Sequence, residues 1–180
     1  AGSGDAVMMK AFGLALAAVA CVGAVSTAHA EVRAGTGGGF TIHHEVVSKE
    51  TPAEAYQRFQ NIASWWDGAH SYSGDAKNLS IDVSPGGCWC EKLPGGGFVE
   101  HMRAILAIPD KTLRFAGALG PLQSVAASAA LTVSFSPVAD GSTKVVFHYV
   151  VVGSDGEKVG ELGDPVDQVM GAALKRFAKS

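Results

Sequence analysis

Short runs of alternating apolar and polar residues dominate the chain from residue 40 to residue 152. Phe40, Ile42, His44 and Val46 alternate with polar neighbours, and a period of two predicts a strand with one buried face. Later runs have the same period and are separated by turns that contain Gly, Pro and Asp, which indicates hairpins. We therefore expect a first strand and then an antiparallel meander of six strands, over 79–83, 88–93, 98–108, 112–117, 131–135 and 144–152.

Two segments have helical periodicity instead. Thr51-Pro52-Ala53-Glu54 is a capping box with proline at the first helical position, and apolar residues then recur at helical spacing up to Ala63. Residues 64–74 are expected to form a second short helix or a loop. Asp164 and Pro165 begin a long C-terminal helix. Its apolar stripe consists of Val166, Val169, Met170, Ala173, Leu174 and Phe177.

This order of elements, β-α-α-β6-α, predicts an α+β fold. The amphipathic stripe of the C-terminal helix has to cover one face of the sheet, so we expect a curved seven-stranded antiparallel sheet wrapped around that helix. A curved sheet that grips one helix seldom fills the space between them. We therefore expect a cavity there.

The N-terminal part of the chain has the layout of a secretory signal peptide. Lys10 precedes an uncharged apolar run from Ala11 to Val25, and Ala28-His29-Ala30 is a small-x-small cleavage site. We expect a signal peptide with an upstream extension over 1–30, a flexible glycine-rich lead-in over 31–39 and one domain over 40–180. The mature protein would be periplasmic or secreted, with no membrane span.

Composition excludes one further class of function. The 180 residues include 14 Lys and Arg and 17 Asp and Glu, for a net charge of −3. Binding to nucleic acid depends on clustered positive charge, so no nucleic-acid partner is expected. The sequence also has no phosphate-binding glycine loop ahead of a helix, no G-x-S-x-G and no H-E-x-x-H.

Cys88 and Cys90 are the two cysteines of the predicted mature chain, and they lie on one face of a predicted strand. A pleated strand holds such side chains apart, which argues against a disulfide between them. A four-residue hairpin loop would place Cys90 opposite His101. Two thiols and a neighbouring histidine are part of a zinc set, in which His70 would be the fourth ligand. The alternative is two small thiols that pack or stay free.

The same hairpin register pairs Glu91 with Glu100 beside Trp89 and Met102. On the inner face, the two carboxyl groups would share an apolar cavity, which would raise the pKa of one of them. That group could then serve as a general acid. On the outer face they would be solvated charges. A shift of one residue in the register would separate them.

Several of these segments resemble the START-like (SRPBCC) superfamily. They are Trp65-Trp66 after the first helix, Gly86-Gly87 before a strand that contains Trp89, and the segment 109–114, together with the 117–123 stretch GALGPLQ. The superfamily includes the major birch pollen allergen, polyketide cyclases and lipid-transfer START domains. The resemblance covers residues 40–180 and implies the helix-grip fold, with a hydrophobic ligand between the long helix and the sheet.

On this basis the leading hypothesis is an exported protein that binds a small hydrophobic molecule or lipid. We expect no cofactor and no metal, and the oligomeric state is left open. The second hypothesis is a cyclase, dehydratase or hydrolase that uses Glu91 or Glu100 as acid or base, and the third is a metal or redox site at Cys88, Cys90 and His101. The expected ligand-binding residues are Trp65, Trp66, His70, Tyr72, Trp89, Met102, Phe115, Gln123, Tyr149 and Met170.

Overall fold

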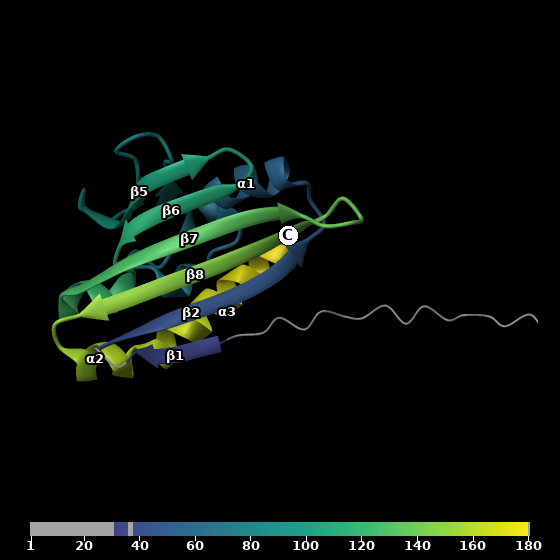
Figure 1. The fold of residues 1–180 in the computed structure, drawn as a ribbon. Helices are drawn as coiled ribbons and strands as arrows, with labels where there is room; N and C mark the ends of the chain where they lie inside the picture. Colours follow the sequence, from purple (N-terminus) through teal and green to yellow (C-terminus); the bar gives the residue numbers. More distant parts are fainter. Residues whose placement is uncertain (1–30, 36–37, 180) are drawn as a thin grey trace, which may run out of the picture.

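An eight-stranded antiparallel sheet forms the body of the computed structural model, which describes residues 31–35 and 38–179. Its strand order is β1-β2-β8-β7-β6-β5-β4-β3. The sheet is curved, and the C-terminal helix lies along one of its faces (Figure 1). The predicted leader, 1–30, lies outside the described residues. The strands are β1 (Glu31–Gly35), β2 (Gly39–Ser48), β3 (Leu79–Ile81), β4 (Cys88–Lys92), β5 (Phe98–Ile108), β6 (Thr112–Gly117), β7 (Ala127–Pro137) and β8 (Thr143–Gly153).

The strands from β2 to β8 confirm the predicted seven-stranded antiparallel sheet, and β1 adds an eighth strand at its edge. The lead-in over 31–39 was expected to be flexible, but Glu31–Gly35 pairs antiparallel with β2. An edge strand offers unpaired backbone donors and acceptors to any neighbouring segment, so this pairing requires no apolar period. This explains why the pattern of the sequence did not indicate it.

In the described part of the chain, three α-helices and four short 3₁₀ segments connect or cover the strands. In α1, the Thr51 side chain accepts from the Glu54 amide, and the Glu54 carboxylate accepts from the Thr51 amide at 2.9 Å, which confirms the predicted capping box. Among the described residues, no helix has both the length and the apolar character needed to cross a membrane. The helical segments are α1 (Pro52–Gln60), η1 (Ile62–Ser64), η2 (Gly68–His70), η3 (Ala76–Asn78), η4 (Gly120–Val125), α2 (Gly156–Glu161) and α3 (Gly163–Lys179).

An aromatic cluster centred on Phe59 joins α1 and α3 to the concave face of the sheet. The Phe59 ring stacks on Trp65 with centroids 5.2 Å apart and meets Phe147 of β8 edge-on at 5.8 Å. Phe177 of α3 meets Trp65 edge-on at 5.8 Å. All four side chains are buried. Edge-to-face contacts add to the stabilisation that burial of such large apolar surfaces provides.

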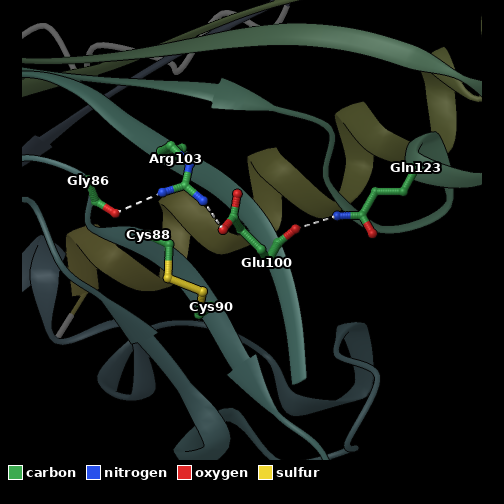
Figure 2. Close-up of a disulfide and its surroundings, with 6 residues drawn as sticks. All are labelled: Gly86, Cys88, Cys90, Glu100, Arg103 and Gln123. Carbon is green, nitrogen blue, oxygen red and sulfur yellow. Dashed lines mark hydrogen bonds and ion pairs between the residues drawn. A yellow bond between two sulfur atoms is a disulfide. The ribbon is translucent and has the colours of Figure 1, made fainter. Parts of the chain in front are cut away.

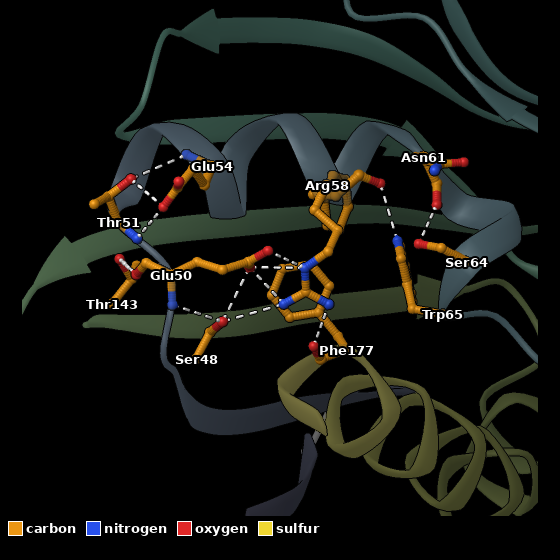
Figure 3. A network of polar contacts seen from close by, with 11 residues as sticks. Ser48, Glu50, Thr51, Glu54, Arg58, Asn61, Ser64, Trp65, Thr143 and Phe177 are labelled. Carbon is orange, nitrogen blue, oxygen red and sulfur yellow. Dashed lines mark hydrogen bonds and ion pairs between the residues drawn. The ribbon is translucent and has the colours of Figure 1, made fainter. Parts of the chain in front are cut away.

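Polar contacts fasten the C-terminal end of α3 to the segment before α1 (Figure 3). Arg58 lies over the Phe177 ring, 3.9 Å from its centroid, and donates to the Phe177 carbonyl oxygen. The same guanidinium group pairs with the carboxylate of Glu50, and it donates to the Ser48 hydroxyl at 3.1 Å. A cation at the end of a helix satisfies its free carbonyl groups, so Arg58 fixes where α3 ends against the sheet.

Candidate functional site

A cavity of about 510 Å³ lies between the first half of α3 and the loops at the β3–β4–β5 end of the sheet. Its volume is within the range of small-molecule sites, and most of its wall is apolar. The 3₁₀ segments η2 and η4 supply its rim, where Tyr72 and Pro121 are exposed. The wall consists of Trp66, Ala69, His70, Ser71, Tyr72, Leu79, Trp89, His101, Leu119, Gly120, Pro121, Pro165, Val166, Val169 and Met170.

One β-bulge determines which polar side chains reach this cavity. Trp89 pairs with Met102 as the predicted hairpin register requires, but the register then shifts, so that Cys90 pairs with Glu100 and Glu91 with Val99. The additional residue on β5 is His101, and both His101 and Met102 are buried. A bulge bends its strand and can turn two consecutive side chains to one face. The predicted pairing of Glu91 with Glu100 is therefore wrong, and so is that of Cys90 with His101.

The bulge brings His101 to Glu91 on the inner side of the sheet. Glu91 is 1% exposed and His101 6% exposed, and their Oε2 and Nε2 atoms are 3.0 Å apart. The Glu91 carboxylate also accepts from the backbone amides of Tyr72, at 3.1 Å, and of Ser73. The loop after η2 is thus bonded directly to β4, and the carboxylate has three donors.

These contacts set the protonation of the pair. Burial raises the pKa of Glu91, but hydrogen bonds from Ser73, Tyr72 and His101 together outweigh it, and the pKa lies below its usual value of 4.5. Burial lowers the pKa of His101 by more than its bond to Glu91 raises it, so this pKa lies below 6.5. At neutral pH the pair is a carboxylate and a neutral imidazole.

Glu100 and Gln123 lie outside the cavity, contrary to expectation. Glu100 extends from the outer face of the sheet, where it pairs with Arg103, and its side chain is 38% exposed. Its backbone carbonyl accepts from the Gln123 side chain at 2.8 Å (Figure 2). Glu100 therefore has the solvated position that was the alternative to an acid or base in the cavity, and Gln123 ties η4 to β5.

Cys88 and Cys90 form a disulfide, contrary to the prediction that they pack or stay free (Figure 2). Their Cα atoms are 5.4 Å apart, closer than the roughly 6.6 Å that a regular strand gives to residues i and i+2. The contraction coincides with the register shift at Trp89 and Cys90, which a pleated-strand argument does not include. A metal set of Cys88, Cys90 and His101 does not form, because the sulfur atoms are bonded to each other and His101 is bonded to Glu91. In the described part of the chain, no group of three or more His, Cys, Asp or Glu could hold a metal ion.

Five of the expected ligand-binding residues line the cavity, and four others are core residues. Trp66, His70, Tyr72, Trp89 and Met170 are in the wall. The other four are buried but are not part of the wall: Trp65, Met102, Phe115 and Tyr149.

Tyr149 contributes to the wall indirectly. Its hydroxyl accepts from the backbone amide of Leu119 at 3.1 Å, which fixes the start of the η4 rim. Burial raises the pKa of this hydroxyl far above its usual value of 10. Tyr149 therefore stays neutral and acts as a support for the wall.

The principal residue that sequence reasoning did not place in the cavity is His101. It was considered only as a metal ligand next to Cys90, since strict alternation on β5 places it on the outer face. Val166 and Val169 were recognised as part of the helix stripe but not as cavity residues. The apolar stripe of α3 was the sequence feature that could have identified them. Its N-terminal half faces the cavity, and its C-terminal half faces the aromatic cluster.

Comparisons with known proteins extend only to the fold. No family model matches the chain, and no curated protein matches it. A conserved protein of unknown function from Enterococcus faecalis superposes with a TM-score of 0.58 at 13% identity, over 83% of this chain and 75% of that one. A protein from Mesorhizobium loti gives 0.54 at 12%, over 77% and 94%. One from Rhodobacter sphaeroides gives 0.52 at 15%, over 83% and 97%. This chain thus has an α+β architecture that solved bacterial proteins also have.

Proposed function

We propose that this protein is an exported START-like protein of the helix-grip type that binds a small hydrophobic molecule or lipid. The observation that carries the proposal is the cavity of about 510 Å³ between α3 and the β3–β4–β5 end of the sheet. Apolar side chains from helix, strands and both rim segments form most of its wall. An apolar ligand gains free energy by moving from water to such a surface.

The rim is built so that a ligand can be enclosed. The Tyr72 hydroxyl donates to the Gly120 carbonyl at 3.1 Å, which joins the two rim loops across the cavity. Trp66 donates from its indole nitrogen to the His70 carbonyl at 3.0 Å and thereby fixes the first of these loops. Loops over a rigid scaffold are common binding elements.

Native mass spectrometry of the chain purified from its own host tests the proposal. The expected spectrum has a second, heavier species whose added mass is lost on denaturation and recovered in an organic extract. Val169→Trp is the control, because a large side chain at this half-buried wall position takes up part of the cavity and should reduce the fraction of the chain that has the added mass. A wild-type chain with no bound molecule, which also fails to take up 2-naphthol, would contradict the proposal.

The Glu91–His101 pair favours one second candidate, an enzyme that uses this cavity. A carboxylate that orients a neutral imidazole is a recurrent arrangement for a general base. In this case His101 would accept the proton from the substrate and Glu91 would orient the imidazole ring. Glu100 would have no role in the reaction. Once a substrate is identified, His101→Phe should lower kcat by about 100-fold or more, whereas Glu100→Gln should leave it unchanged.

A further inference from the structure

One buried polar atom of a wall residue has no hydrogen-bond partner among the described residues. The Tyr72 hydroxyl and the Trp66 indole both donate to backbone carbonyls of the rim. His101 also contributes to the wall, and its Nδ1 is buried without a partner among the described residues. A buried polar atom that is left unpaired is unfavourable, so it indicates a partner that arrives with a ligand.

The partner of Nδ1 has to be a donor. Nε2 of His101 is 3.0 Å from the Glu91 carboxylate, which accepts hydrogen bonds and cannot donate one. The imidazole proton therefore lies on Nε2, and Nδ1 has a free lone pair. A hydroxyl group of a ligand would satisfy it, whereas an ether or ketone oxygen would not.

The charges around the cavity exclude an anionic ligand. The wall, all of it within the described residues, contains no lysine and no arginine. The buried Glu91 carboxylate is bonded to the wall residue His101. A fatty-acid carboxylate or a phosphate would lose its hydration there and meet a like charge.

We propose that the cavity takes an uncharged apolar molecule with a hydroxyl group that donates to Nδ1 of His101. This inference rests on the proposed function and specifies the class of its ligand. Nδ1 is shielded from solvent in this structure, so a neighbouring group has to move. The proposal assigns this movement to the Tyr72 ring, whose centroid is 5.9 Å from that of His101, since Tyr72 is 56% exposed and its hydroxyl makes one hydrogen bond to the rim.

Calorimetric titration of the full chain with three matched probes at pH 7 tests the inference. The probes are 2-naphthol, which has the donor, 2-methoxynaphthalene, which lacks it, and 2-naphthoate, which is an anion. We expect 2-naphthol to bind about five- to tenfold more tightly than the ether, as one hydrogen bond predicts, and 2-naphthoate to bind most weakly.

Each other result has a distinct meaning. Equal affinities for 2-naphthol and 2-methoxynaphthalene would overturn the inference and leave the proposed function intact, and so would tightest binding of 2-naphthoate. No binding of any probe at about 1 mM would contradict the proposed function itself and the inference with it.

Variants of His101 locate the preference. In His101→Phe the advantage of 2-naphthol over the ether should fall to about one, with the affinity for the ether retained. His101→Asn offers an amide oxygen close to the position of Nδ1 and should keep part of the preference. His43→Phe is the matched control, because His43 lies on the opposite face of the sheet. This variant should prefer 2-naphthol over the ether as strongly as the wild-type chain does. A preference that persists in a folded His101→Phe chain would contradict the role of Nδ1.

Discussion

Glu91 shows how a single side chain can be buried with its charge. The loss of hydration is offset by hydrogen bonds from two backbone amides and from His101. The same bonds join three parts of the molecule, because the amides belong to the loop after η2 and His101 to β5. Glu91 therefore stabilises both the wall of the cavity and its rim.

Glu91→Ala should lower the free energy of unfolding by about 2–4 kcal/mol, because it leaves the two amides and the imidazole without an acceptor. Urea denaturation measures the change. Glu100→Ala is the control, since Glu100 is an exposed carboxylate directly next to the bulged residue His101, and its effect should stay within about 0.5 kcal/mol. Similar losses in the two variants would contradict the account of Glu91.

Stability should fall as the pH falls, and His101 accounts for the first part of the change. Its pKa in the folded chain lies below 6.5 because burial disfavours the imidazolium. Above 6.5 both folded and unfolded chains hold His101 neutral; below it the unfolded chain binds the proton first and is favoured. Glu91, whose pKa is also lowered, adds a loss as the pH falls below about 4.5.

Denaturation curves at pH 7.5 and pH 5.5 check this sign. The wild-type chain should be less stable at pH 5.5, and His101→Phe should show a smaller difference between the two pH values. An equal difference between the two pH values in the wild-type chain and in His101→Phe would contradict the assignment of this change to His101.

At the scale of the elements, β4 and β5 show what the sequence could and could not predict. The alternation identified both strands and placed Trp89 and Glu91 on the same face, but it did not decide whether that face is the inner one. It could not indicate the bulge, since one additional residue leaves the apolar pattern of Phe98–Ile108 unchanged to either side. Because of the bulge, His101 lies on the inner face and Glu100 on the outer face. The partner of Glu91 is therefore His101, and the predicted pair of carboxylates does not form.

The disulfide on the outer side of β4 should contribute a modest stability. Closing so short a loop restricts the unfolded chain little, so the double substitution Cys88→Ser with Cys90→Ser should lower the free energy of unfolding by about 1.5 kcal/mol. A thiol assay on the unreduced, denatured chain 31–180 should find no free thiol. Two reactive thiols per chain would contradict the disulfide.

At the scale of the whole molecule, the cavity follows from a curved sheet and one helix that covers only part of it. The C-terminal half of α3 meets the aromatic cluster around Phe59, and Arg58 fixes its end. Val166, Val169 and Met170 of the N-terminal half line the cavity instead, and Trp66 and Trp89 are on its wall with them. The fold and the existence of a cavity were predictable from element order and helix periodicity. Its polar chemistry was not, because it depends on one bulge.

Backbone amide shifts of the ¹⁵N-labelled chain during titration with 2-naphthol test the central claim most directly, since they show whether and where an apolar molecule binds. The account predicts that the changes concentrate in residues 66–72, 119–120 and 166–170 and at His101, and that Val169→Trp reduces them. Changes confined to the outer face of the sheet, around Ile105 and Val152, or no changes at all, would contradict the claim that this cavity is a binding site.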